Sequence, residues 1–262
     1  MTATRDDAIA AYAAQRAITR RALDAAKLAT SEVAALLEAG RDTIAIRTRP
    51  AKAADQRVGA TRLGGLPDLP AGVTWPQREG YEFDFVGQLR LEELAALDVH
   101  DLLPHDGMLS FFAGHDVTPT SEWQLAHRVE LYRGALAPDP GDTASRPRHR
   151  RPPKARGVEL SPLFLLPPPW STWLPEITHS ERYYELCEEL YRLSTEPLHP
   201  GSGLFGFDRT YEAALSADER MLLRLDAGEQ VPYDHSESVT LCFVMRPGHD
   251  VTDVRSFEGA SI

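Results

Sequence analysis

An internal repeat is the feature that most constrains how this chain can fold. The pentapeptide Gly-His-Asp-Val-Thr occurs at residues 114–118 and again at residues 248–252, each time just after an apolar stretch. Two upstream segments correspond in the same order, residues 85–89 with residues 221–225 and residues 63–68 with residues 204–209. Three matches in one order indicate an old duplication. We therefore predict that segments 85–89 and 221–225 form equivalent strands related by a pseudo-twofold axis.

The first 40 residues have a helical pattern instead. Residues 5–39 are rich in alanine and contain neither proline nor glycine. Apolar residues recur there at steps of three and four, the period of one helix face, namely Ile18, Ala22, Ala25, Ala29, Val33 and Leu36. Gly40 is the expected C-terminal stop because glycine adopts the left-handed conformation without strain. Thr30-Ser31 could serve as an N-cap, so one long helix and a helical hairpin both remain open.

Alternating patterns follow from residue 41 onward. Strands are predicted at residues 42–49, 83–91, 108–112, 125–131, 221–225 and 239–245, with helices at residues 91–97 and 180–193 and turns throughout residues 63–76. In the clearest strand Phe83, Phe85 and Leu89 alternate with mostly polar residues, which predicts one buried and one polar face. The fold class expected is α+β, an N-terminal helical segment followed by a mixed, largely antiparallel β structure from two duplicated halves.

Two domains are predicted from these patterns. Residues 1–40 form the helical segment and residues 41–262 the α+β domain, with pseudo-repeats at about 57–136 and 198–262. Between them, residues 137–156 hold five prolines and a run of basic side chains without a core-forming pattern. Such an insertion is typical of a mobile loop, so we expect it to lack regular structure and to be the first site that trypsin cuts.

Composition narrows the classes of partner. The chain has 28 Lys and Arg against 39 Asp and Glu, a net charge of −11, which repels nucleic acid and anionic lipid. Such a charge favours either solubility alone, the preferred interpretation, or a basic partner protein. No apolar run approaches the roughly 20 residues of a membrane helix. The N-terminus is acidic where a signal peptide is basic, so a cytoplasmic location is expected. Cys187 and Cys242 lie far apart and are interpreted as small buried hydrophobic residues.

No motif in the chain predicts catalysis. Residues 201–206 match the dinucleotide-binding Gly-x-Gly-x-x-Gly pattern, with Asp226 suitably downstream, but that motif needs a strand before its first glycine. Pro197 and Pro200 argue against such a strand, so the match is interpreted as chance. The nucleophile elbow, the zinc-protease helix, the phosphate-binding loop and a Cys/His cluster are all missing from the sequence. We predict no catalytic residue, cofactor or metal.

Two groups of residues are candidates for a partner or ligand surface. His115 with Asp116 and His249 with Asp250 could form two His/Asp pairs about the pseudo-twofold axis, usable for metal binding or acid–base chemistry. Structural turns are the favoured interpretation, as for the polar loop at residues 100–106. The second group is Trp170 and Trp173, which are either core anchors or part of a partner-facing patch.

Several motifs together resemble the YwqG-like family, a bacterial domain of unknown function. The motifs are Gly64-Gly65-Leu66-Pro67, Leu69-Pro70, Trp75-Pro76, Phe85-Val86-Gly87-Gln88-Leu89, Glu93-Leu94, Gly107-Met108-Leu109-Ser110-Phe111-Phe112 and, in the second half, Leu204-Phe205-Gly206-Phe207 and Leu222 to Asp226. The chain departs from the family at Tyr233-Asp234-His235-Ser236, where a Trp-Gly-Asp turn is frequent. The resemblance implies a duplicated, largely antiparallel α and β fold, and it implies no activity.

Two functions are therefore carried forward. The first is a non-catalytic protein-binding module, of an immunity or regulator type, with a basic partner protein. The alternative is a hydrolase or small-molecule-binding enzyme with a cleft between the two halves. A deep pocket lined by converging polar side chains would favour the enzyme, whereas a flat acidic or aromatic patch would favour the binding module.

Overall fold

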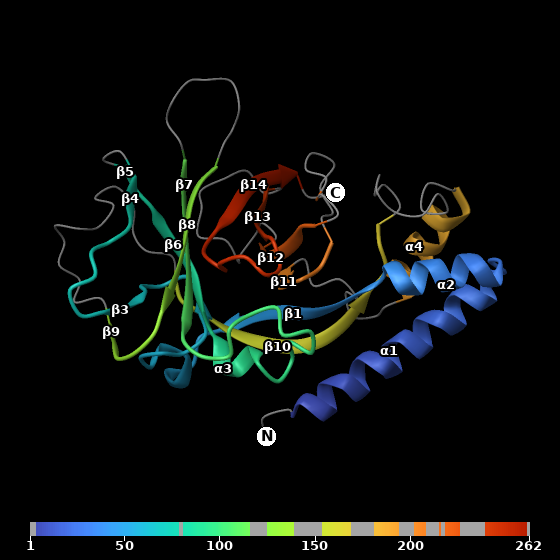
Figure 1. Cartoon of the computed structure of the whole chain (residues 1–262), viewed down its shortest axis with the longest axis horizontal. Helices are drawn as coiled ribbons and strands as arrows, with labels where there is room; N and C mark the ends of the chain where they lie inside the picture. The colour runs from blue at the N-terminus through green and yellow to red at the C-terminus, as the bar shows by residue number, and fades with distance from the viewer. Residues whose placement is uncertain are drawn as a thin grey trace.

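The protein is an antiparallel ten-stranded sheet with a helical arm at one side (Figure 1). The computed structural model describes residues 4–78, 81–115, 125–138, 154–168, 181–193, 202–207, 215, 218–225 and 239–260. The helices are α1 (Arg5–Ala25), α2 (Thr30–Ala39), α3 (Leu91–Leu94) and α4 (Glu181–Leu193), with a 3-10 turn at Ala53–Gln56. The strands are β1 (Arg41–Pro50), β2 (Arg62–Leu63), β3 (Asp68–Pro70), β4 (Gln77–Arg78), β5 (Tyr81–Glu82), β6 (Asp84–Arg90), β7 (Met108–His115), β8 (Leu125–Tyr132), β9 (Leu136–Pro138), β10 (Arg156–Leu165), β11 (Ser202–Leu204), β12 (Arg220–Leu225), β13 (Val239–Met245) and β14 (Val254–Ala260).

The sheet is built outward from a long central pair. β1 and β10 pair antiparallel over their full length, from Arg41 opposite Leu165 to Pro50 opposite Arg156. The strand order β14-β13-β12-β11-β1-β10-β2-β6-β7-β8 places four strands on each side of this pair. β2 extends from β10, whereas β11 extends from β1. The group formed by β2, β6, β7 and β8 therefore borders β10, which comes later in the sequence. The group formed by β11 to β14 borders β1, which comes from the start of the chain.

The two outer groups share local irregularities as well as strand order. The β6–β7 ladder shifts register between Phe85 and Gly87, and the β12–β13 ladder shifts between Met221 and Leu223. Directly after each group's first short strand, β2 or β11, a residue takes a left-handed backbone: Gly64 with φ of 66° and Phe205 with φ of 63°. These features agree with the predicted equivalence of residues 85–89 and 221–225, while common descent of the two groups stays a prediction.

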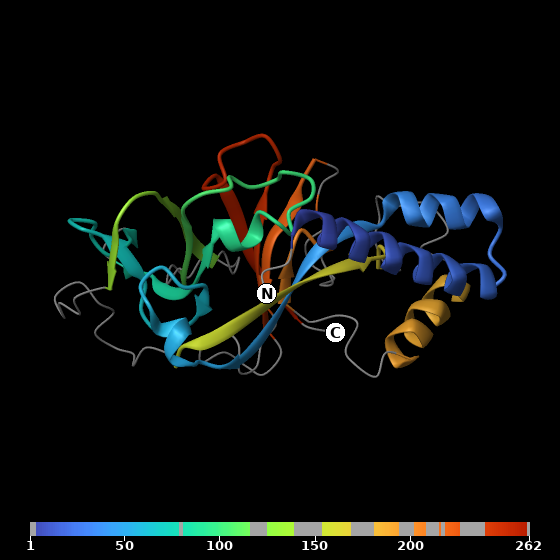
Figure 2. The same ribbon diagram turned by 90° about the horizontal axis from the view of Figure 1, so that it is seen from below.

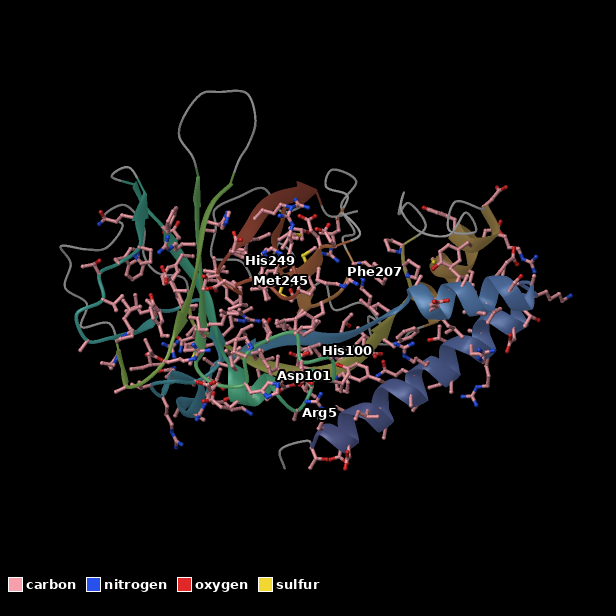
Figure 3. The ribbon with its side chains drawn as sticks, in the orientation of Figure 1. Arg5, His100, Asp101, Phe207, Met245 and His249 are labelled. Atoms are coloured by element: carbon pink, nitrogen blue, oxygen red, sulfur yellow. The ribbon has the colours of Figure 1, made fainter. Side chains whose placement is uncertain are left out.

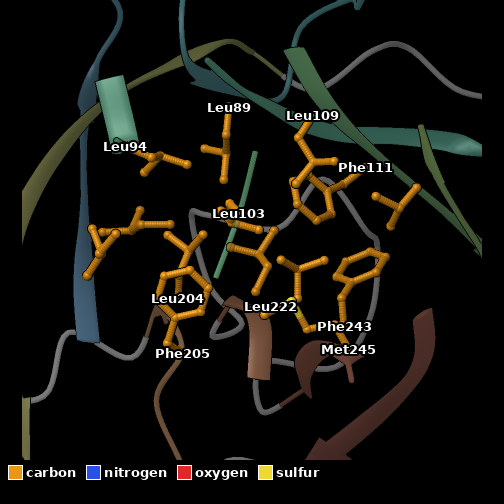
Figure 4. Close-up of a cluster of buried hydrophobic side chains, with 14 of the residues drawn as sticks. Leu89, Leu94, Leu103, Leu109, Phe111, Leu204, Phe205, Leu222, Phe243 and Met245 are labelled. Atoms are coloured by element: carbon orange, nitrogen blue, oxygen red, sulfur yellow. The ribbon is translucent and has the colours of Figure 1, made fainter. Parts of the chain in front are cut away.

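The sheet curls until its two edges meet, so it is nearly a barrel. The imidazole Nε2 of His127 on β8 hydrogen-bonds to the carbonyl oxygen of Val254 on β14. Hydrophobic side chains from both outer groups fill the interior (Figure 4). At its centre Phe111 of β7 and Phe243 of β13 pack edge to face, with ring centroids 5.1 Å apart. One hydrophobic core thus joins the two groups.

A second core covers the outer face of β6 and β7. The segment between β2 and β6 folds over this face, and the Trp75 indole N–H donates to the carbonyl oxygen of Phe83 at 2.6 Å. Trp75 and Phe85 both pack against Phe112, with centroid distances of 6.0 and 5.5 Å. The predicted polar face of this strand was therefore wrong: residues 85–89 are buried on both sides, and Gln88 is fully buried.

The helical arm is carried by β1 and β10, which run on beyond the barrel (Figure 2). α1 is fastened to β10 by Gln15, whose side chain donates to the Pro162 carbonyl at 3.0 Å and accepts from the Phe164 amide at 2.6 Å. Hydrophobic side chains of α1, α2 and α4 form a separate core that contains Leu23, Leu28, Val33, Leu36, Tyr183 and Leu186. The helical hairpin is thus the correct alternative for the N-terminal segment.

Gly40 ends α2 as predicted, but for a different reason. Its backbone is extended, with φ of −64° and ψ of 154°, so the left-handed conformation is not used. A Cβ atom at this position would lie 2.2 Å from the Phe164 ring. Glycine is needed because the chain passes close to that ring where it enters β1.

Strands β9, β10, β11 and β14 were absent from the sequence prediction, as were the short strands β2 to β5. β9 and β10 border the segment predicted to lack structure, of which residues 139–153 lie outside the described part of the chain. β10 was missed because it holds Pro162, and β14 and the short β11 have weak alternation. β11 contains Gly203, so the middle of the apparent dinucleotide motif is a strand rather than a phosphate-binding turn.

Replacing Gly64 by alanine should lower the free energy of unfolding by about 1–2 kcal/mol, because an L-residue is strained at its positive φ. Gly206→Ala is the matched control, since its backbone is not left-handed and a Cβ there would lie 3.5 Å from Leu165 Cδ1. Urea denaturation of both variants measures the difference. Equal losses in the two variants would contradict a conformational requirement at Gly64.

Candidate functional site

Four of the six candidate surface residues cannot be assigned a side-chain environment. Trp170, Trp173 and Asp116 lie outside the described residues. His115 is the last residue of β7, paired with Leu125, and its side chain is likewise outside the described part. The interpretation of these four residues stays a prediction.

His249 and Asp250 lie in the exposed turn between β13 and β14 (Figure 3). The carboxylate of Asp250 accepts hydrogen bonds from the backbone N–H of Thr252 at 2.9 Å and from its hydroxyl at 2.8 Å. The backbone bond lowers the pKa of Asp250 below its usual range. The His249 amide donates to the Arg246 carbonyl at 3.0 Å. Asp250 therefore acts as a local turn cap, the chemistry of an Asx turn.

The two Gly-His-Asp segments lie at opposite ends of the β7–β8 ladder. His115 closes the β7–β8 ladder at the end opposite to Met108 and Tyr132. Arg133 follows Tyr132, and its charge contributes to the lowered pKa of Asp250. The second segment is thus near the Tyr132 end of the ladder, a strand length away from His115. A symmetric site that uses both histidines is not what this backbone provides.

A different set of the predicted residues does come together. The carboxylate of Asp101, in the loop after α3, accepts hydrogen bonds from both terminal guanidinium nitrogens of Arg5 on α1, at 2.7 and 2.8 Å. His105 Nε2 lies 3.0 Å from the same carboxylate. Asp106 pairs with Arg133 at 3.2 Å, the arginine that also acts on Asp250. Arg133 therefore pairs with the 100–106 loop and lies close enough to the β13–β14 turn to act on Asp250 electrostatically.

His100 belongs to a second Arg–Asp–His group beside the first (Figure 3). Its Nε2 lies 3.0 Å from Asp42 Oδ2, and Arg16 of α1 contacts the same carboxylate through two nitrogens at 3.2 and 3.1 Å. The Asp42 side chain is only 8% exposed, whereas that of His100 is 54% exposed. This group holds α1 and the loop against β1 and leaves the imidazole in solvent.

Exposed carboxylates accumulate along this end of the barrel, which we call the acidic rim. The rim comprises Glu92, Glu93, Asp101, Asp106, Asp218, Asp250 and Asp253. Four arginines lie among them, and each is paired with a rim carboxylate: Arg5 with Asp101, Arg90 with Glu92, Arg133 with Asp106 and Arg246 with Asp218. Glu93, Asp250 and Asp253 are left in excess, so the rim has a negative charge.

The described side chains in and beside the rim are carboxylates, arginines and two histidines. His100 and His105 each have a carboxylate partner, which is a base with its orienting group, but their described contacts include no serine, threonine or cysteine nucleophile. Within the described residues, no three Asp, Glu, His or Cys side chains converge as metal ligands would. The rim thus presents solvent-exposed carboxylates, of which Glu92, Asp101, Asp106 and Asp218 are paired with arginines.

A buried polar network around Asp68 supports the glycine-rich turn at residues 63–68. Asp68 Oδ2 accepts from the Gly59 amide at 2.8 Å, from Arg62 at 2.9 Å and from the Gln88 side chain at 2.7 Å. The Gln88 side-chain oxygen in turn accepts from the Asp68 amide at 2.9 Å. The charged side chains of Arg62 and Asp68 are 7% and 3% exposed. Two of the motif segments quoted above, the glycine-rich turn and the Gly-Gln-Leu strand, are thus joined by a structural contact.

One family model matches the chain. It describes a domain of unknown function, DUF1963, and it matches residues 61–137, the segment that includes the buried network, β6, β7 and β8. The match agrees with the expected domain of unknown function, although it does not name the YwqG-like family. No curated protein matches the chain. None of the described helices is both long and apolar enough to cross a membrane.

The sequence indicated two of the polar segments in this site, but it did not predict the contacts between them. The polar loop at residues 100–106 and the turn at His249 and Asp250 were both noted, but as separate features. The link through Arg133 has no local sequence signal, because it joins residues that only the barrel brings together. The partnership of Arg5 with Asp101 is equally non-local.

Replacing Asp68 by alanine should destabilise the fold by about 3–5 kcal/mol, because it leaves the buried Arg62 without its carboxylate. Asp106→Ala is the control, since its pair with Arg133 is 70% and 57% exposed and exposed pairs contribute about 0–1 kcal/mol. Chemical denaturation of the two variants distinguishes them. Similar, small losses would show that the Asp68 network is not a support of this turn.

Proposed function

We propose that the protein is a non-catalytic protein-binding module whose acidic rim binds a basic segment of a partner protein. The observation that supports this is the excess of carboxylates on the rim after each of its arginines has been paired. A fixed negative surface increases the rate of encounter with a basic partner and makes the association sensitive to salt. The net charge of −11 extends the same field over the whole molecule.

The packing of the barrel interior argues against the enzyme alternative, which requires a cleft between the two halves. That space is occupied by one hydrophobic cluster to which both outer groups contribute. Phe111 and Phe243 meet there at 5.1 Å, and Leu109, Leu222 and Leu223 around them are fully buried. Interiors packed to this degree leave little room for a substrate. In the described part of the chain, polar groups that could bind a partner are therefore on the outside.

We also infer that the two outer groups descend from one duplicated unit. The mirrored strand order, the shared register shift and the paired left-handed residues Gly64 and Phe205 support this inference. In such a protein the first strand of each unit, β1 or β10, pairs with the other unit. Both units contribute carboxylates to the rim, Asp101 and Asp106 from the first and Asp218 and Asp250 from the second.

A cytoplasmic location and a role as an immunity or regulatory factor complete the proposal. The chain has two cysteines, Cys187 and Cys242, whereas small secreted domains that depend on disulfides are rich in cysteine. A factor that neutralises or regulates another protein by occupying it needs a stable scaffold and a charged surface, and it needs no catalytic residue. The YwqG-like resemblance is compatible with this role because it implies no activity.

Reversing two of the excess rim charges should abolish partner binding. In the variant Glu93→Lys/Asp253→Lys, the rim loses its excess of carboxylates, whereas Glu38→Lys/Glu181→Lys changes the net charge equally at exposed positions on the helical arm. Affinity capture from the native host at low salt, compared by mass spectrometry, should recover a specific basic protein with the wild type and with the arm variant. The rim variant, or high salt, should release it.

Two results would contradict the proposal. Recovery of the same partner by the rim variant would show that the rim is not the interface. Turnover of a small molecule that is lost in His249→Ala or His115→Ala, without a captured partner, would support the enzyme instead.

A further inference from the structure

Helix α1 presents to solvent a face that the fold does not use. Its buried side chains, Ala8, Tyr12 and Leu23, face the barrel and the helical hairpin. On the opposite side an exposed row recurs at steps of three and four: Asp6, Ala10, Ala13, Ala17 and Arg21, with Ala14 beside it. Ile9 and Ile18 flank this row and are 49% and 57% exposed. Large apolar side chains exposed on either side of a smooth alanine face are typical of an interface.

The two halves of this row carry opposite charges, Asp6 in the first and Arg21 in the second, while the exposed Asp24 lies beyond Arg21 in the last turn. Asp6 lies in the first turn and Arg21 toward the C-terminal end, at equal distances from the midpoint between Ala13 and Ala14. Ala10 and Ala17, and likewise Ile9 and Ile18, are symmetric about the same midpoint. The face is therefore complementary to itself when it is turned end for end. A copy placed in the same direction would instead put Asp6 against Asp6.

We propose that this face of α1 binds the same face of a second copy of the chain, with the two helices antiparallel about a twofold axis between Ala13 and Ala14. The alanines allow the helix axes to approach to about 8 Å, the close end of the usual range. Asp6 of one copy then faces Arg21 of the other, and twofold symmetry forms this ion pair twice. The helix of 21 residues gives a contact about 30 Å long.

Charge complementarity selects a second copy over other occupants. Any amphipathic helix could cover alanines and isoleucines, but only a helix with a basic end and an acidic end, in reversed order, satisfies both Asp6 and Arg21. The chain's own α1 has this pattern. The arm extends away from the barrel (Figures 1 and 2), so the barrel does not cover this side of the helix. One pair of helices is a small interface, which implies a weak dimer.

The rim does not contribute to this contact, so the dimer and the proposed function can fail independently. A single-chain explanation also exists for Asp6, because an acidic residue in the first turn of a helix complements the helix dipole. The two explanations predict opposite results when the charges are exchanged. Exchanging both charges preserves self-complementarity but opposes the dipole.

Charge-swap variants of the full chain, compared by sedimentation velocity at low salt, test the dimer. Asp6→Arg and Arg21→Asp should each weaken self-association by about tenfold or more, because each brings like charges together twice. The double variant should restore the dimer. An equimolar mixture of the two single variants should form a heterodimer, since both contacts between position 6 of one copy and position 21 of the other then join an arginine with an aspartate.

A second pair of variants tests the centre of the face. Ala14→Glu places two carboxylates beside the twofold axis and should give a monomer, whereas Ala34→Glu, exposed on α2, should leave the dimer unchanged. Circular dichroism verifies that each variant is folded. A wild-type protein that stays monomeric at the highest soluble concentration, single variants that associate like the wild type, or a mixture that stays monomeric would each overturn the proposal.

Discussion

The pairing of β1 with β10 is the interaction on which the remaining structure depends. It is the longest ladder in the described sheet, with ten residues of each strand in continuous register. On one side the sheet continues through β11, β12, β13 and β14, and on the other side it continues through β2, β6, β7 and β8. Its far end carries the helical arm through Gln15 and the Phe164 contact that requires Gly40. Because the two strands are far apart in sequence, closing this pair carries a large loop-entropy cost.

The same pairing explains why the surface is the place to look for function. The central strands hold two outer groups face to face, and their side chains merge into one core around Phe111 and Phe243. Polar residues are thereby excluded from the space between the groups. Exposed carboxylates are found instead at the barrel end, where Arg133 pairs with Asp106 of the loop after α3 and acts electrostatically on Asp250 of the β13–β14 turn. The helical arm, at the other extreme, offers a separate surface on α1.

Local patterns in the sequence predicted the elements that are locally determined. β7, β12, β13, α4 and the helical hairpin follow hydrophobic periodicity that neighbouring residues alone establish. β10 was not predictable in this way, because proline is rare in a central strand, where its missing N–H leaves a ladder hydrogen bond unmade. In β10 the carbonyl of Pro162 accepts a hydrogen bond from the side chain of Gln15, a contact that the local sequence does not indicate. Gln88 was predicted to face solvent because the sequence of its own strand does not indicate that the segment around Asp68 folds over it. The candidate site behaved alike: the turn at Asp250 was recognisable, and its approach to Arg133 was not.

Hydrogen exchange on the intact protein, resolved by residue, tests the central role of the β1–β10 pair most directly. If the two outer groups are held together through this ladder, its backbone amides become accessible only when the whole molecule unfolds. The account predicts that amides of residues 44–48, in the middle of β1, and their partners in β10 exchange last, with the free energy of global unfolding. Exchange of these amides through a smaller opening than that of β6–β7 or β12–β13 would contradict it.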